Sequence, residues 1–326
     1  MIDYPVIDDV LKNYNLQVEE IEEYSSFYKL KTNRGTKILR AWNDVETLDF
    51  AFQFRESLAH EGFRKIDRFI RTNDGQPYIL NEDQGFVLTD WIEGKIPVSS
   101  NPEHMKTIGK TLAEFHQAMV KIKTNQTFEP WSHHFKRGLG HLMQIEKVVS
   151  QKQRKTPLDD IVLKYIPSQQ AQMRRSIEMS EKLERTYFRN EKEPGWCLGN
   201  VQLNRFRIDR FEEGWIFDLG LPIYDLPAYD LAKMVAHVYQ RNGFQEDIIY
   251  KLLDAYQEKN PLEIDDKKWI LTYLSYPHDL WKFLYIYFIA KVPQKGYSLE
   301  MQYQQLVGLQ INIEQLYQVL YVYFQL

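Results

Sequence analysis

The chain has 326 residues, 44% of them hydrophobic, and its 41 basic and 45 acidic side chains give a formal charge of −4. A chain of this length can bury one large core or two smaller ones, and we expect two lobes. The near balance of charge, without any block of lysine or arginine, excludes a general electrostatic attraction to nucleic acid, so we expect no nucleic-acid partner.

Two further features argue against a disulfide framework and a membrane span. Cys197 is the only cysteine, and the first residues have neither the basic start nor the apolar core of a signal peptide. No apolar run reaches the roughly 18 residues of a transmembrane helix. We therefore expect a protein of the reducing cytoplasm with no membrane partner, and the sequence leaves the oligomeric state open.

The first 90 residues are expected to form a small sheet with one helix. Residues 27–40 alternate around a turn at residues 33–35, a pattern that predicts a β-hairpin. Asp44 is expected to cap a following helix that ends near His60. Three further strands are predicted at residues 65–72, 77–80 and 85–91.

Glu56 lies on the apolar stripe of this predicted helix, four residues after Phe52. A carboxylate that points inward needs a cation, and Arg40 on the preceding strand is the nearest candidate by order and spacing. Alternatively, Glu56 lies at the edge of the stripe and pairs with Arg55 or with an exposed lysine. The residues alone leave both arrangements open.

The chain beyond the following linker changes to helical patterns. Asn101 can cap a helix whose first position is Pro102, and an apolar stripe follows to Met119. His116 flanks this stripe and is expected to be a hydrogen-bonded core histidine, not a ligand. Residues 121–160 show no spacing of histidine, cysteine and carboxylate that is typical of a metal site.

The stretch from Pro194 to Ala232 carries the motifs that bear on chemistry. A Gly199-Asn200 turn is followed, 18 residues after Asn200, by Asp218 at the end of an apolar run, in the phrase Asp-Leu-Gly. This layout is typical of a phosphotransferase loop followed by a metal-binding aspartate. The sequence therefore indicates a phosphotransferase-like site.

The order of these elements resembles the protein-kinase-like fold. Within that fold, the chain is similar to the aminoglycoside phosphotransferase and choline kinase superfamily, and more narrowly to the spore-coat-associated kinase-like proteins of the CotS family. The resemblance implies an α+β fold with an antiparallel-sheet N-terminal lobe at residues 1–90 and a mainly helical C-terminal lobe at residues 91–326. The phrases that carry it are residues 32–40, 62–65, 88–94 and 224–233.

The resemblance also gives roles to the loop residues. Active members carry a His-Gly-Asp phrase, and its aspartate and histidine correspond here to Asn200 and Leu198. The metal-binding asparagine that follows corresponds to Arg205, although Asn204 lies beside it. Asp218 corresponds to the metal-binding aspartate. If a metal is bound at all, the resemblance implies that Asp218 and Asn204 hold it.

The nucleotide side of the site is implied by the same resemblance. The strand lysine that binds phosphates corresponds to Arg40 and its partner glutamate to Glu56, whereas Asp230 matches an aspartate that supports the loop by accepting backbone N–H bonds. The turn at residues 24–27 has no glycine, so its amides approach phosphates less easily. The remnant nucleotide cleft would be lined by Arg40, Glu56, Asp90, Trp91, Ile92 and Arg205.

These replacements weaken the expected chemistry. Asn200 can accept a hydrogen bond but cannot hold the proton of an attacking hydroxyl, a loss that typically costs about 10² to 10⁴ in rate. Arg205 places positive charge where magnesium needs an oxygen ligand. We expect Asp218 to pair with Arg205 in place of a metal.

The sequence is compatible with three functions. The first is a noncatalytic, pseudokinase-like component of the endospore coat, made in the mother-cell cytoplasm, with other spore coat proteins as partners and no cofactor, as the resemblance implies. The second is a phosphotransferase that uses ATP and Mg²⁺ on a small hydroxylated substrate, with Asp218 or Asp209 as base. The third is a nucleotide-binding sensor without turnover, because adenine recognition depends on the linker backbone.

Overall fold

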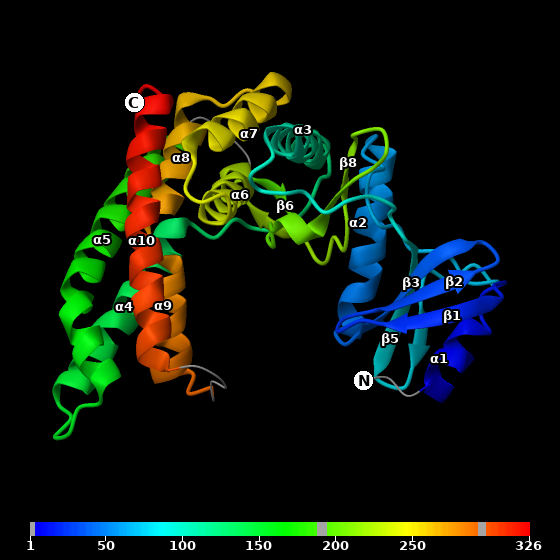
Figure 1. Cartoon of the computed structure of the whole chain (residues 1–326), viewed down its shortest axis with the longest axis horizontal. Coiled ribbons are helices and arrows are strands. Elements are labelled where there is room, and N and C mark those ends of the chain that lie inside the picture. Colours follow the sequence, from blue (N-terminus) through cyan, green and yellow to red (C-terminus); the bar gives the residue numbers. More distant parts are fainter. Residues whose placement is uncertain (1–3, 188–193, 293–297) are drawn as a thin grey trace.

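The computed structural model describes residues 4–187, 194–292 and 298–326. Along the longest axis of the molecule, an antiparallel sheet lies at one end and a group of long helices at the other, with shorter helices between them (Figure 1). This is the α+β arrangement that the sequence predicts, with a small sheet followed by a mainly helical remainder.

The sheet has five strands, each antiparallel to its neighbours, and confirms the predicted hairpin. Tyr28, Leu30 and Thr32 are buried and alternate with more exposed lysines, and Gly35 makes the turn with a φ of +83°. Across the sheet, the strands are β1 (Val18–Glu23), β2 (Tyr28–Thr32), β3 (Gly35–Trp42), β5 (Gln84–Asp90) and β4 (Ile79–Asn81).

The predicted strand at residues 65–72 is wrong. This segment makes only isolated bridges, from Phe69 to Thr89 on β5 and from Ile66 to Ile216 far along the chain. It leaves the edge of the sheet to reach the other part of the molecule, so it cannot continue beside β5. The predicted division at residue 90 stays a prediction, because this segment contacts both parts.

Helices cover the two faces of the sheet. On one face, α1 (Tyr4–Leu11) packs Ile7 and Val10 against the sheet. This helix has only eight residues and was not predicted from the sequence. On the other face lies α2 (Leu48–His60). The predicted side-chain cap by Asp44 is wrong, since a 3₁₀ turn at Val45–Thr47 precedes α2 and Asp44 accepts through its backbone carbonyl.

The remainder of the chain forms one large core of helices and short strand pairs. Asn101 caps α3 as predicted, because its side chain accepts from the backbone N–H groups of Glu103 and His104. β6 (Gly195–Cys197) pairs with β9 (Ile223–Asp225), and β7 (Phe206–Ile208) pairs with β8 (Gly214–Ile216). The helices are α3 (Pro102–Met119), α4 (Trp131–Ser150), α5 (Pro157–Tyr187), α6 (Pro227–Arg241), α7 (Glu246–Lys259), α8 (Ile264–Ser275), α9 (His278–Leu284) and α10 (Leu299–Tyr323), with a π-helical turn at Tyr285–Ile289.

Within the described ranges, no helix combines the length and the apolar character that a membrane crossing requires.

Gly109 permits the close approach of α3 and α7. A Cβ atom at this position would clash with the carbonyl oxygen of Leu252 and would lie 3.1 Å from the backbone nitrogen of Tyr256. We therefore expect Gly109→Ala to lower the free energy of unfolding by about 1–3 kcal/mol, measured by urea denaturation.

The matched control is Gly140→Ala, at an exposed position of α4 where an added Cβ meets no atom within 4 Å. This change should raise the free energy of unfolding by about 0.5–1 kcal/mol, because alanine favours the helix. Equal effects of the two substitutions would contradict the packing described for α3 and α7.

Candidate functional site

Asp218 and Arg205 form the ion pair that the sequence predicts. Asp218 follows β8 in a left-handed conformation with a φ of +58°, and Arg205 ends a 3₁₀ turn at Leu203–Arg205. Arg205 Nη1 lies 2.9 Å from Asp218 Oδ2 and also donates to the carbonyl oxygen of Asp218. The side chains are 26% and 31% exposed, so the pair is partly shielded from water.

Arg40 approaches the other oxygen of the same carboxylate. Its guanidinium is buried on β3, with Nε 3.5 Å from Asp218 Oδ1 and Nη1 3.4 Å from Asp67 Oδ2. Thr89 Oγ1 accepts a further hydrogen bond from Nη1 at 3.4 Å. Both oxygens of Asp218 therefore face guanidinium groups, and the residues present do not fit a magnesium ion, which requires free oxygen ligands.

Glu56 does not pair with Arg40, and that prediction is wrong. It lies at the edge of α2, where both its oxygens accept from Arg68 at 2.7–3.0 Å. The open alternative placed Glu56 correctly at the edge but named the wrong partners. The inward position belongs to Arg55, which is buried and donates to the backbone carbonyl of Asp67 at 2.9 Å.

Asp67 is the counterion that the sequence analysis missed. It is buried, and its Oδ1 lies 3.7 Å from Arg55 Nη2 and accepts from the backbone N–H of Leu219 at 3.1 Å. Burial lowers the pKa of the Arg55 guanidinium, and the charge of Asp67 opposes this effect. One carboxylate thus serves Arg40 and Arg55 together.

Aromatic rings pack between the linker and Asp218. Phe27, from the turn that joins β1 and β2, lies with its centroid 6.1 Å from that of Phe217 and 6.4 Å from that of Trp91. The Arg40 guanidinium lies 5.4 Å from the Phe27 centroid and 5.3 Å from the Phe217 centroid, and Arg207 lies 4.1 Å from that of Phe217. These side chains fill the space beside the Arg40 guanidinium.

The predicted linker residues divide between two environments. Ile92 is buried beside Phe217, and Trp91 packs on the same cluster. Asp90 instead pairs with Lys37 at 2.5 Å, and the carboxylate is 69% exposed. The structure therefore brings Trp91 and Ile92, but not the Asp90 side chain, toward the Arg40 and Asp218 centre.

One face of α6 holds the backbone of the loop at residues 198–203. Asp230 accepts from the backbone N–H groups of Leu198 at 2.5 Å and Gly199 at 3.0 Å, which confirms its predicted role. Lys233 donates to the carbonyl oxygen of Gly199, and His237 Nε2 accepts from the N–H of Leu203 at 3.3 Å. Lys233 and His237 were not predicted, although their spacing of three and seven residues from Asp230 is that of one helical face.

The side chains of this loop differ in exposure. Leu198 is buried, whereas Asn200 and Asn204 are exposed. Asn204 contributes its backbone carbonyl to Arg207 Nη1 at 2.9 Å. The predicted pairing of Asn204 with Asp218 around a metal therefore has no support from a site in which Arg205 already contacts Asp218.

His116 is a core histidine, as predicted. Its Nδ1 lies 2.8 Å from the Tyr256 hydroxyl and its Nε2 lies 3.2 Å from Asp230 Oδ2, and the side chains of His116 and Asp230 are both buried. Cys197 Sγ lies within 4.8 Å of a ring nitrogen of His116 and a carboxylate oxygen of Asp230. Burial raises the pKa of the Cys197 thiol, and Asp230 is already committed to the loop, so this cluster does not suit a metal.

Comparison with known proteins supports the kinase-like interpretation. The model of the family described as "Spore coat putative kinase YutH" matches residues 7–319. An aminoglycoside phosphotransferase from Alicyclobacillus acidocaldarius subsp. acidocaldarius DSM 446 superposes with a TM-score of 0.84 at 17% identity, covering 100% of this chain and 97% of that chain.

Two further solved structures are similar over almost their whole length. Spectinomycin phosphotransferase APH(9)-Ia, in complex with ADP and spectinomycin, gives a TM-score of 0.66 at 12% identity, over 97% of this chain and 99% of that chain. Choline kinase LicA from Streptococcus pneumoniae gives 0.56 at 13% identity, over 94% and 98%. At sequence identities this low, the structural similarity establishes the fold alone.

A double-mutant cycle should measure the Arg205 and Asp218 pair. Combining Arg205→Gln with Asp218→Asn is expected to show a coupling free energy of about 1–2 kcal/mol in urea unfolding, because the pair is partly shielded. The control cycle uses Lys12 and Asp9, which lie 2.7 Å apart but are fully solvated and should show no measurable coupling. Similar coupling in both cycles would contradict the proposed role of shielding.

The contact of His237 should make stability depend on pH. Burial, with a smaller contribution from Arg241, lowers the pKa of His237 to about 4, below the unfolded value of about 6.5. The unfolded chain then binds the proton more readily, so this contribution is present above about pH 6.5 and is lost as the pH falls toward 4. His237→Gln should reduce the slope of unfolding free energy between these values.

The control for this measurement is His133→Gln, at an exposed position of α4. It should leave the slope as it is in the unaltered protein. A slope that is insensitive to His237→Gln would show that His237 is not buried in its neutral form.

Proposed function

Because the chain belongs to the spore coat putative kinase YutH family, we propose that it is a noncatalytic component of the endospore coat. It reaches the coat from the mother-cell cytoplasm and acts there by contacting other coat proteins. In this proposal the kinase-like fold serves as a scaffold, and neither ATP nor Mg²⁺ is a cofactor.

The observation that carries the proposal is the position of Asp218 between two arginines. Arg205 Nη1 lies 2.9 Å from one oxygen and Arg40 Nε lies 3.5 Å from the other. Phosphoryl transfer in kinase-like enzymes depends on an aspartate that holds the metal at the nucleotide phosphates. Here the two guanidinium groups neutralise that carboxylate, so metal binding would have to displace an existing ion pair.

Two other features support the same conclusion. Asn200, at the position of the catalytic base, has a neutral amide that cannot take up the proton of a substrate hydroxyl. Phe27 packs against Phe217 and Trp91 where a nucleotide would need space. These features support the proposal that proton transfer, metal binding and nucleotide entry are all impaired.

Thermal unfolding with and without Mg²⁺ and ATP tests the proposal. A nucleotide bound at about 100 times its dissociation constant would add roughly 2.7 kcal/mol of stability, whereas we expect an unchanged melting temperature. Mg²⁺-dependent transfer of phosphate from ATP to a small alcohol, abolished by Asp218→Ala, would contradict the proposal and support the phosphotransferase alternative.

One observation favours a second candidate, a sensor that binds an anionic ligand without turnover. Arg40 Nη2 is buried and has no hydrogen-bond partner among the described residues. A buried guanidinium with an unsatisfied donor is a suitable contact for a phosphate or carboxylate. If this candidate is correct, ADP or pyrophosphate will raise the melting temperature without Mg²⁺, and Arg40→Lys will reduce the effect.

A further inference from the structure

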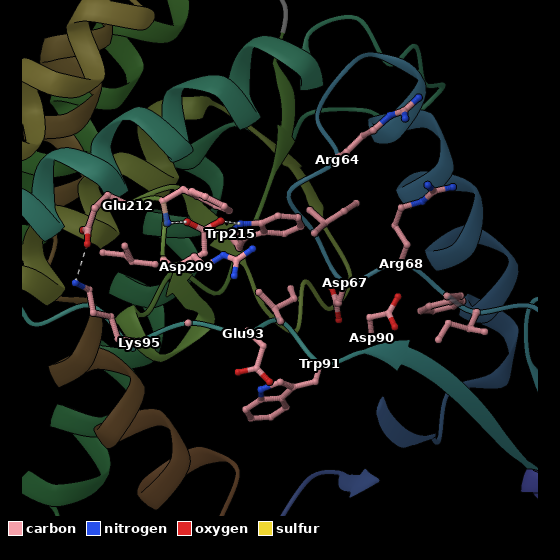
Figure 2. Close-up of a pocket in the computed structure, with 18 of the residues that line it drawn as sticks. Arg64, Asp67, Arg68, Asp90, Trp91, Glu93, Lys95, Asp209, Glu212 and Trp215 are labelled. Carbon is pink, nitrogen blue, oxygen red and sulfur yellow. Dashed lines mark hydrogen bonds and ion pairs between the residues drawn. The ribbon is translucent and has the colours of Figure 1, made fainter. Parts of the chain in front are cut away.

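A second concave surface adjoins the Asp218 centre and shares Asp67, Trp91 and Ile92 with it. We call it the linker groove; it is lined by parts of three segments, residues 64–71, residues 90–95 and the hairpin at 208–215, and it has a volume of about 1310 Å³. Figure 2 shows Arg64 and Arg68 on one side of the groove and Trp215, Asp209 and Glu212 on the other.

The size of the linker groove suits a polypeptide better than a small molecule. Pockets for compact ligands usually have volumes of about 300–1,000 Å³. The linker groove exceeds this range, and a second hollow of about 740 Å³ shares Glu56, Arg64 and Arg68 with it. The two together form an extended surface that a single small ligand would leave largely unfilled.

Most carboxylates of the linker groove are engaged, whereas Glu93 is exposed and has no ion pair among the described residues. Glu56 pairs with Arg68, Asp90 with Lys37, and Glu212 with Lys95, while the buried Asp67 serves Arg40 and Arg55. Asp209 accepts hydrogen bonds from the Trp215 indole and from two backbone N–H groups of its own hairpin. Although burial raises the pKa of Asp209, these bonds lower it below its usual value overall.

Several cations of the linker groove have no such partner. Arg64, Arg71 and Arg210 are exposed, and none of them has a carboxylate partner among the residues that the structure describes. Arg64 donates to the backbone carbonyl of Ala59, and Arg210 lies 4.8 Å from the Phe211 centroid. The linker groove thus offers free guanidinium groups to a ligand, although the chain as a whole is slightly acidic.

Aromatic side chains line the same surface. Phe69, Trp91 and Trp215 contribute to the groove, and Phe211 at the hairpin tip is 69% exposed. The combination of accessible arginine with tryptophan and phenylalanine is typical of the contacts that dominate protein–protein binding. Apolar side chains of a ligand can be buried here between its charged ones.

The hairpin side of the groove is fixed to the linker. Lys95 and Ile208 exchange two backbone hydrogen bonds of 2.9 Å each. Gly94 permits this close approach, because a Cβ at that position would lie 2.7 Å from the Ile208 carbonyl oxygen. A surface held in this way loses little conformational freedom on binding.

We propose that the linker groove docks an extended, acidic segment of a partner protein, with aromatic or aliphatic side chains between its carboxylates. The inference rests on the proposed function in taking that partner to be another coat protein. The free guanidinium groups select the acidic side chains, and the groove aromatics bury the apolar ones.

The test uses the full-length protein and short fluorescent peptides of equal length. The probe alternates glutamate with tyrosine, and the comparison peptides replace glutamate by glutamine or lysine. We expect saturable binding of the glutamate peptide, with its affinity reduced about tenfold or more by Arg64→Glu combined with Arg210→Glu, and weakened further by salt.

The matched control is Arg174→Glu combined with Arg175→Glu, at exposed positions of α5, which should leave binding unchanged. The proposal would be overturned by an equal loss of binding in both variants, or by binding of the glutamine or lysine peptide as tightly as the glutamate peptide. It would also be overturned if pyrophosphate competed at similar concentration, or if the protein self-associated and lost this association with Arg64→Glu and Arg210→Glu. Unaltered melting temperatures of both variants exclude misfolding as the cause of lost binding.

The two proposals fail separately. Arg64 and Arg210 have no described ion pair with Asp218, so Mg²⁺-dependent binding of ATP would contradict the noncatalytic role and leave the peptide result valid. Absence of peptide binding would overturn the docking inference alone.

Discussion

The carboxylate of Asp218, held between Arg40 and Arg205, determines what the rest of this site can do. A partly buried negative charge needs a positive partner. In a kinase-like enzyme a metal ion supplies it, and a metal can exchange and carry phosphates. Here two covalently attached guanidinium groups supply it at 3.5 Å and 2.9 Å. The charge of the Asp218 carboxylate is therefore balanced without a ligand. Asp218 then has no need of a metal ion, bound with a nucleotide, as its positive partner.

The loop beside this centre is supported through its backbone. Asp230, Lys233 and His237 hold the backbone of the loop from one face of α6. These contacts involve backbone atoms, so they are indifferent to whether the loop side chain is an aspartate or Asn200. The fold can therefore match solved phosphotransferases along almost its whole length whatever the side chains of this loop are.

Sequence reasoning was most successful where a short phrase defined the geometry. The hairpin around Gly35 and the Asp218 and Arg205 pair followed from local pattern and from family register. It was harder to predict which charged residue of α2 faces the interior, because two adjacent charged residues fall near the same edge of its apolar stripe. A rotation of a fraction of a turn exchanges Arg55 for Glu56 as the inward residue.

Asp67 gave no local signal at all, since Arg40 is 27 positions and Leu219 is 152 positions away. The linker groove likewise combines three segments distant in sequence.

The position of Asp67 has a mechanical consequence. This single buried carboxylate meets a strand of the sheet through Arg40, a helix through Arg55 and the segment after Asp218 through the N–H of Leu219. Kinase-like enzymes typically open and close as substrates enter and products leave. In this molecule α2 packs on the sheet and would move with it. Swinging the sheet away would therefore separate Arg40 from Asp218 and the Asp67 carboxylate from the N–H of Leu219 at the same time. We therefore expect a stiff body whose outer surfaces keep fixed positions relative to one another, as the proposed assembly with neighbouring proteins would require.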